Sequence, residues 1–168
     1  MEQVCRDITV MRNDEISVDE VQAFSHILIS PGPGLPAEAG ITMAVIKKYH
    51  ESKSLLGVCL GCQAIAEFFG GNLYNQKLVA HGIARKVNQV ASGKLLQDMP
   101  PTFEAGLYHS WAIDESNLTK EVLITSKSEM NTVMSLEHLR LNIYGVQFHP
   151  ESIMTKNGLQ IIKNWLKV

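Results

Sequence analysis

Two cysteines stand three positions apart, Cys59 and Cys62, in the stretch GVCLGCQ at residues 57–63. This spacing is compatible with half of a zinc site, with a redox-active dithiol, or with two unrelated thiols. Zinc is disfavoured because a structural site needs about four ligands, Cys5 is far away in the sequence, and no His-x-x-x-His motif is present. A redox dithiol needs a helix start, which is available here, but the rest of the chain does not follow the thioredoxin order of elements.

The glycines of the same stretch favour the third interpretation. Gly57-x-Cys59-x-Gly61 follows an expected strand and opens an expected helix, which is the pattern of a nucleophile elbow with cysteine in place of serine. A helix N-terminus favours a thiolate at Cys59, and the amide of Leu60 is then free to stabilise an oxyanion. Taken alone, the motif also fits a buried cysteine at the end of a strand.

A base for such a nucleophile is present in GVQFHPES, at residues 145–152. His149 ends an apolar strand, and Pro150 keeps it out of the helical region. Glu151 is two residues further on, so in an extended segment both side chains project to the same side. A histidine at a strand end is often only a surface residue, but together with Cys59 this pair predicts a Cys-His-Glu triad.

The elements that must position these residues alternate between short apolar runs and helical patterns. This alternation indicates an α/β fold with a mainly parallel sheet in the first half and more antiparallel strands in the second. A capping box at Ser17 and Glu20 predicts a short helix, and glycines at 70 and 71 predict a helix end. Strands are expected at residues 7–12, 27–30, 55–58, 83–90, 103–108, 122–125, 132–136 and 143–148. Helices are expected at residues 41–51, 61–69 and about 155–166, with an ordered loop at residues 31–34.

Composition restricts the classes of function. The length of 168 residues predicts one domain. The chain has 15 Lys and Arg and 17 Asp and Glu, so its net charge is −2, and it has no basic run. Nucleic acid is therefore not an expected partner. The most apolar region, residues 55–69, is too short and too polar to span a membrane. The N-terminus shows no signal peptide pattern and three cysteines make no disulfide framework, so we expect a cytoplasmic protein.

Three motifs in this order, SPGPG, GVCLGCQ and GVQFHPES, resemble those of the class I (triad-type) glutamine amidotransferases, and the resemblance extends over nearly the whole chain. Within that class, VMRNDEIS, SPGPGLPAEAGI, LYHSW and GLQIIKNWL are most similar to the small subunit of anthranilate synthase and to its relative in 4-aminobenzoate synthesis. The fold that this implies is an open, mainly parallel flavodoxin-like sheet flanked by helices, with additional antiparallel strands in the second half.

The resemblance implies hydrolysis of L-glutamine to glutamate and ammonia through a glutamyl thioester. Cys59 would be the nucleophile, His149 the general base and acid, and Glu151 the residue that orients His149. The ammonia would pass to a separate chorismate-binding subunit, in tryptophan biosynthesis or, alternatively, in folate biosynthesis. Neither a metal nor a cofactor is expected.

The resemblance also assigns substrate-binding residues. The amides of Leu60 and of the Gly32-Pro33-Gly34 loop would form the oxyanion hole, with Gly34 as the donor because Pro33 lacks an amide hydrogen. Gln63 would help to hold the substrate, and the backbone of Ser110 and Trp111 would bind its α-amino and carboxylate end. His81-Gly82 would face the synthase subunit.

Two features depart from the family pattern. Cys62 stands where relatives have His or Met, so a bystander role is expected for it. The family opens with a strand and a helix that carry an Asp-Ser-Phe motif, whereas this chain begins near the end of that helix. Because that first strand lies inside the sheet, its loss would expose inner edges. Two alternatives therefore stay open, a different cysteine hydrolase or redox protein on a similar fold and a non-catalytic interaction subunit.

Overall fold

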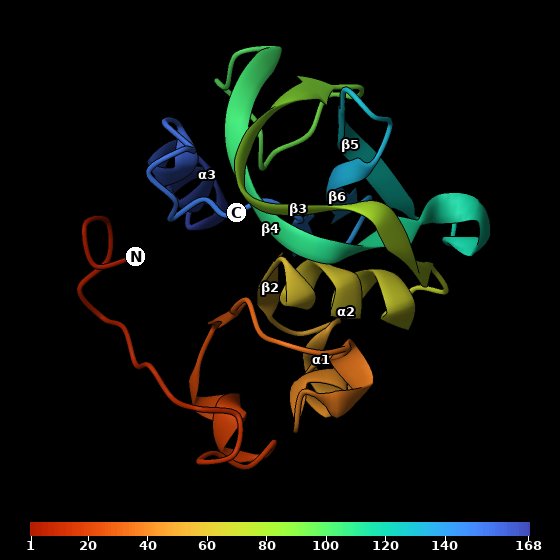
Figure 1. Cartoon of the computed structure of the whole chain (residues 1–168). Helices are drawn as coiled ribbons and strands as arrows, with labels where there is room; N and C mark the ends of the chain where they lie inside the picture. The colour runs from red at the N-terminus through yellow and green to blue at the C-terminus, as the bar shows by residue number, and fades with distance from the viewer.

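The computed structural model describes residues 1–168, apart from the side chain of Leu78. Across these residues seven strands form one mixed sheet in the order β1-β2-β7-β6-β5-β3-β4 (Figure 1). The strands are β1 (His26–Ile29), β2 (Ser54–Val58), β3 (Asn72–Gln89), β4 (Thr102–Asp114), β5 (Val122–Ser128), β6 (Val133–His138) and β7 (Ile143–Val146). The helices are α1 (Thr42–Tyr49), α2 (Leu60–Phe68) and α3 (Gly158–Trp165), with short 3-10 turns η1 (Glu20–Ala23), η2 (Pro36–Glu38) and η3 (Glu115–Asn117).

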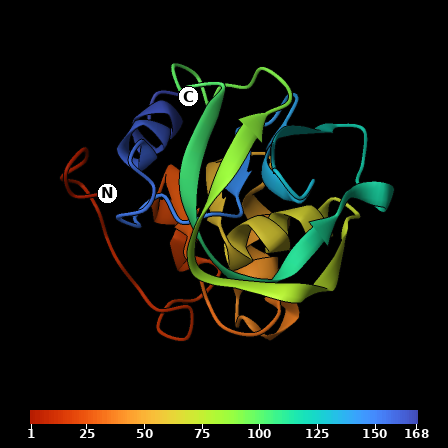
Figure 2. The same ribbon diagram turned by 45° about the horizontal axis from the view of Figure 1, so that its top comes forward.

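The α/β fold is confirmed, but parallel pairing is less extensive than expected. Among the described strands, only β1 with β2 and β2 with β7 pair in parallel. β7, β6, β5, β3 and β4 pair antiparallel in that order, and β3 and β4 form a long curved pair (Figure 2). The reason is connectivity, because helices α1 and α2 follow β1 and β2, whereas in the described residues no α-helix stands between β3 and β7.

Successive side chains of the central strands point to opposite faces of the sheet, so the apolar core is divided into two clusters. Leu55 of β2 packs in one apolar cluster with Ile46 of α1 and Ile65 of α2. Leu56, the next residue, packs in a second cluster with Trp165 of α3. Since successive side chains of a strand point to opposite faces, α1 and α2 cover one face of the sheet and α3 covers the other.

The strand expected at residues 7–12 is absent, and this prediction was wrong. Within the described structure these residues belong to neither a strand nor a helix, and Val10 is 87% exposed. Figures 1 and 2 both show the N-terminal segment running outside the sheet. An extended segment is stable as a strand only when it pairs with a neighbour and buries one face, and β1, at that edge of the sheet, pairs only with β2 in the described residues.

Two local predictions are confirmed, the capping box and the glycine helix end. Ser17 and Glu20 exchange the two hydrogen bonds of the capping box before η1. Gly70 has φ +88° just after α2, and the amide of Gly71 donates to the Ala66 carbonyl, as in a glycine C-cap. Within the described residues, none of the helices has the length and apolar character that crossing a bilayer requires.

Several boundaries differ from expectation, among them the end of β4 at Asp114 rather than at residue 108. β3 begins at residue 72 rather than 83, because it continues past an irregular stretch opposite β4. The last helix begins at Gly158 rather than near residue 155. The side chain of Thr155 accepts a hydrogen bond from the Gly106 amide at 2.9 Å and donates one to the His149 carbonyl at 2.7 Å. Thr155 therefore anchors the loop after β7.

Candidate active site

Three segments meet at the carboxyl edge of the parallel strands. β2 and β7 are neighbours with Val58 opposite Val146, so Cys59 and residues 147–151 leave the sheet side by side. The amide of Cys59 donates a 2.8 Å hydrogen bond to the Val146 carbonyl. The loop at residues 31–34 follows β1, on the other side of β2. This is the edge at which open α/β sheets bind their ligands.

Cys59 has the strained backbone of a nucleophile elbow. Its φ is +53°, in a region that residues with a side chain rarely adopt. A β-carbon on Gly57 would lie 2.3 Å from the Gly61 backbone, and one on Gly61 would lie 2.4 Å from the Ile29 carbonyl oxygen. Leu60 is the first residue of α2, so its amide has no acceptor within the helix. The turn thus requires both glycines and leaves the Leu60 amide free beside Cys59.

We expect Gly57→Ala to destabilise the fold by about 3 kcal/mol, because its β-carbon would meet backbone atoms that no rotamer change can move away. Gly32→Ala is the matched control, since its β-carbon would lie 3.5 Å from Leu60 Cδ1, an ordinary contact, and should change stability by about 0.5 kcal/mol or less. Urea denaturation followed by circular dichroism measures both. Similar losses in the two variants would show that the Gly57–Gly61 approach does not hold the turn.

His149 is oriented by Glu151. Its Nδ1 atom lies 2.7 Å from Oε1 of Glu151. Burial by itself lowers the pKa of His149, but hydrogen bonds and charge interactions with Cys59 and Glu151 outweigh it and raise the pKa to about 9. Burial likewise raises the pKa of Glu151, yet its hydrogen bond to His149 outweighs that effect and leaves the pKa below its usual value. Both groups of the pair are therefore charged at neutral pH.

The second ring nitrogen of His149 is the one available to Cys59. Nε2 is buried, and among the described residues it has no partner at regular hydrogen-bond geometry. Interaction with Cys59 nevertheless contributes to the raised pKa of His149. Since Nδ1 is held by Glu151, Nε2 is left to exchange a proton with the sulfur. Such contacts are often loose without substrate and tighten when it binds.

The loop at residues 31–34 borders the elbow through Gly32, which lies next to the Leu60 side chain. Gly34 has φ +76°, a conformation that glycine adopts without strain. Pro33, between the two glycines, carries no amide hydrogen. The prolines predicted a defined loop at residues 31–34, and the structure has one there. Binding of an oxyanion by the Gly34 amide stays a prediction.

The ladder between β3 and β4 opens at Ser110. Asn75 pairs with Trp111 and Ala80 with His109, so residues 76–79 bulge opposite Ser110. Within the described strands Ser110 has no register partner in β3, so the regular pairing of β3 with β4 is interrupted there. This is consistent with the predicted binding of the substrate's α-amino and carboxylate end by Ser110 and Trp111.

Gln63 is buried, and its amide nitrogen is already engaged. Nε2 donates to the Trp111 carbonyl at 3.0 Å and to Oε1 of Gln147 at 3.1 Å. Both hydrogens of the amide are therefore used within the protein. The predicted contact of Gln63 with a substrate would have to be made by its Oε1 atom, which accepts hydrogen bonds.

The structure adds residues that the sequence reasoning did not single out as part of the site. Nε2 of Gln147 lies 3.6 Å from the Cys59 sulfur. The ring of Tyr108 packs edge-on against His149 at 4.8 Å between centroids and also against His81 at 5.6 Å. Gln147 is two residues before His149 and so on the same side of an extended segment, which was the available signal. No comparable signal marks Tyr108, because its contact depends on the pairing of distant strands.

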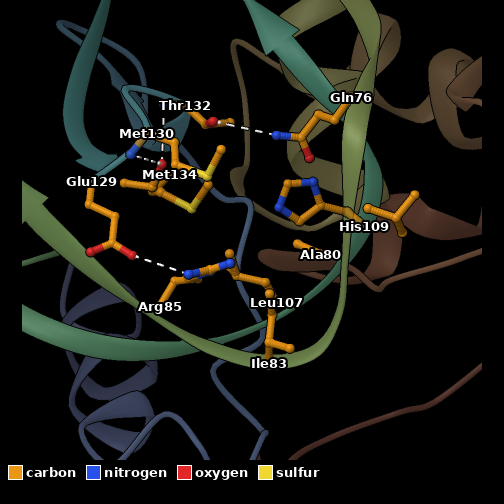
Figure 3. A pocket seen from close by; sticks show the side chains of 12 residues that line it. Gln76, Ala80, Ile83, Arg85, Leu107, His109, Glu129, Met130, Thr132 and Met134 are labelled. Atoms are coloured by element: carbon orange, nitrogen blue, oxygen red, sulfur yellow. Dashed lines mark hydrogen bonds and ion pairs between the residues drawn. The ribbon is translucent and has the colours of Figure 1, made fainter.

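A small cavity of about 30 Å³ lies behind the site, between β3, β4 and the β5–β6 turn (Figure 3). His109 borders it together with Gln76 and Ala80, and the ring is 5% exposed. Burial lowers the pKa of His109, only partly offset by its hydrogen bond to the Trp111 carbonyl. His109 is thus a neutral residue that supports the strand carrying Trp111.

Cys62 lies in a different environment from Cys59. Its side chain is fully buried in α2, and its sulfur would be 2.7 Å from a β-carbon on Gly145. Burial, and secondarily the nearby Cys59, raises the pKa of the Cys62 thiol well above its usual range. Cys62 is thus a packed thiol. Among the side chains that the structure describes, no group of three or more His, Cys, Asp or Glu residues gathers as in a metal site.

Comparisons with known proteins show which family the sequence matches. A sequence model of the family described as glutamine amidotransferase class-I matches residues 1–168. The chain is 42% identical over 159 residues to a Haemophilus influenzae protein named as anthranilate synthase component II, covering 95% of this chain and 82% of that protein. It is 37% identical over 162 residues to the aminodeoxychorismate synthase component 2 of Klebsiella aerogenes, covering 95% and 86%.

Similarity extends to solved structures. A Thermoplasma acidophilum protein described as part of a GMP synthase is similar with a TM-score of 0.82 and 26% sequence identity. The matched region covers 92% of this chain and 77% of that protein.

Proposed function

The chain belongs to the class-I glutamine amidotransferases, and on that premise we propose that it is the glutamine-hydrolysing subunit of a chorismate-using synthase. The observation that carries the proposal is the meeting of Cys59 and His149 at the ends of adjacent parallel strands, with Glu151 2.7 Å from the imidazole. A nucleophile, a base and an orienting carboxylate in this arrangement suit acyl transfer from an amide.

In the first half of the proposed reaction, the Cys59 thiolate attacks the side-chain carbonyl carbon of glutamine. The amides of Leu60 and Gly34 stabilise the oxyanion that forms. The imidazolium of His149 donates its proton to the leaving nitrogen, the C–N bond breaks, and ammonia departs from a glutamyl thioester. A His149 pKa of about 9 supports this step, because the proton is in place at neutral pH.

In the second half, His149 is neutral and removes a proton from water, which attacks the thioester carbonyl. The C–S bond then breaks, glutamate is released, and the proton restores the imidazolium beside the Cys59 thiolate. Each turnover thus converts one glutamine and one water into one glutamate and one ammonia. Glu151 does not change its charge, and it holds His149 with Nε2 toward the sulfur.

The acceptor of the ammonia is proposed from the relatives. Proteins named as component 2 of anthranilate synthase and of aminodeoxychorismate synthase are both similar to this chain. We place the chorismate-binding subunit on the face that carries His81 and Gly82. His81 is exposed, and its ring contacts Tyr108, which contacts His149, so a partner on this face would lie close to the ammonia. The anthranilate pathway is the first candidate and the aminodeoxychorismate pathway the alternative.

We expect the purified chain to support glutamine-dependent product formation when it is mixed with chorismate and the appropriate large subunit. Each large subunit is tested separately, with anthranilate fluorescence for one and 4-aminobenzoate, after lyase addition, for the other. Ammonia in place of glutamine is the control, since it bypasses this chain and should sustain the large subunit by itself.

The outcomes separate the alternatives. Glutamine-dependent product with only one large subunit assigns the pathway. Binding to a large subunit without any glutamate release would support the non-catalytic interaction subunit instead. Activity that requires Cys62 while Cys59 is dispensable would contradict the proposal and support redox chemistry.

A further inference from the structure

A buried row of hydrogen bonds connects the Cys59 sulfur to β4. The Nε2 atom of Gln147 lies 3.6 Å from the Cys59 sulfur. The Oε1 atom of Gln147 accepts a hydrogen bond from Nε2 of Gln63 at 3.1 Å. Gln63 Nε2 also donates to the Trp111 carbonyl at 3.0 Å. Gln147 is 0% exposed and Gln63 is 3% exposed, so water does not compete for these bonds.

The direction of every hydrogen bond in this row is fixed by one backbone group. The Trp111 carbonyl can only accept, so the Gln63 atom beside it must be the amide nitrogen. The second hydrogen of that nitrogen then points at Gln147, whose facing atom must be its oxygen. The remaining Gln147 atom, next to Cys59, is consequently the NH₂ group. If the oxygen and nitrogen of the Gln147 amide were exchanged, two NH₂ groups would face each other at Gln63, and two acceptors would face each other at Cys59.

We propose that Gln147 is a positioning residue that holds the Cys59 sulfur and stabilises its thiolate form by donating an amide hydrogen. The inference rests on the proposed role of Cys59 as the nucleophile. A hydrogen bond to a charged acceptor in a buried site is stronger than one to a neutral acceptor, so the bond favours the thiolate over the thiol. Proton exchange with the sulfur stays the role of His149.

The other groups around Cys59 do not supply this contact. On the loop after β7, His149 is the group that interacts with Cys59, and Glu151 holds its other ring nitrogen. Cys62 in α2 is buried with its pKa strongly raised, so it adds no charge. Gln147 comes from the loop between β7 and His149, and it is neutral at every working pH. Its removal therefore changes hydrogen bonding at the sulfur without removing a charge.

The test is the pH dependence of Cys59 alkylation by iodoacetamide, in the full chain with Gln147→Met. Methionine has about the same size but no N–H donor. Peptide mass spectrometry follows Cys59 and the remote Cys5 in one digest. We expect the pH of half-maximal Cys59 reactivity to rise by about one unit, so that the rate below the midpoint falls about tenfold. The reactivity of Cys5 should not change.

Asn164→Leu is the matched control. Asn164 is also a buried amide, and it donates to the carbonyls of Leu95 and Gln97, away from Cys59. The control loses comparable hydrogen bonds and should leave the Cys59 profile unchanged. An unchanged profile in Gln147→Met would overturn the inference. Wild-type Cys59 that reacts no faster than Cys5 at neutral pH would instead contradict the proposed nucleophile itself.

A measurement on the wild-type protein covers the case in which Gln147→Met fails to fold. The side-chain amide signals of Gln147 in a ¹H–¹⁵N spectrum should shift when Cys59 is alkylated, because their acceptor changes from a thiolate to a thioether. The signals of Gln160, which pairs with Asn164 in α3, should stay in place. Gln147 signals that do not respond would overturn the inference independently of any variant.

Discussion

Replacing Cys59 by alanine should lower glutamine hydrolysis by about 10⁴-fold or more, while replacing Cys62 by alanine should change it less than about threefold. Loss of a covalent nucleophile leaves only binding and oxyanion stabilisation, which explains the size of the first effect. Cys62 is fully buried in the first turn of α2, where its sulfur packs near Gly145. Its removal leaves a small cavity and costs about 1 kcal/mol of stability.

The measurement is glutamate release in the presence of the large subunit, with a glutamine-analogue electrophile as a second readout. Saturable labelling should appear at Cys59 in the wild type and in Cys62→Ala, and it should vanish in Cys59→Ala. Thermal denaturation of both variants controls for folding. Equal rates in wild type and Cys59→Ala would remove the thioester from the mechanism.

The site was largely predictable because short local motifs contain the residues that carry its chemistry. Gly57-x-Cys59-x-Gly61 specifies a turn in which a β-carbon at either glycine would lie only 2.3 or 2.4 Å from backbone atoms, so other residues do not fit at these two positions. His149 and Glu151 are two residues apart, so their 2.7 Å contact follows from the extended backbone alone. The apolar runs at β2 and β7 likewise predicted buried strands, which are found at residues 54–58 and 143–146.

The features that sequence reasoning missed depend on pairing between distant segments. The bulge opposite Ser110 arises from the register of β3 against β4, which no local pattern encodes. The contact of Gln147 with Cys59 depends on β7 lying beside β2, across 88 residues of sequence. The error at residues 7–12 has the same origin, because alternating apolar residues predict a strand only if a neighbouring strand accepts their hydrogen bonds.

Replacing Glu151 by glutamine should lower kcat by about 10² to 10⁴-fold and move the alkaline limit of activity to lower pH. Burial alone lowers the pKa of His149, and interactions with Cys59 and Glu151 together raise it to about 9. Without the Glu151 carboxylate, the pKa of His149 must fall. His149 would then lose its proton nearer neutrality, and the proton needed by the leaving ammonia would be missing. The alkaline limb near pH 9 should therefore shift down by at least about one unit.

The shifted pKa values of His149 and Glu151 also determine how the stability of the fold changes with pH. Because the folded pKa of His149 lies above its unfolded value, its contribution to stability is complete below about pH 6.5 and is lost as pH rises through about 9. The folded pKa of Glu151 is lowered, so its contribution is lost as pH falls through that lowered value. The stability difference between wild type and Glu151→Gln should thus be largest in mildly acidic solution and shrink toward pH 9.

Glu121→Gln is the matched control for the pH dependence of activity. Glu121 also lies beside a histidine, with 3.9 Å to His138, but on the opposite part of the sheet from Cys59. The control variant should keep the wild-type pH profile, and pH-rate curves with the large subunit present compare the two. If Glu151→Gln kept an alkaline limb near pH 9, the limb would belong to another group, and Glu151 would act on the orientation of His149 without acting on its charge.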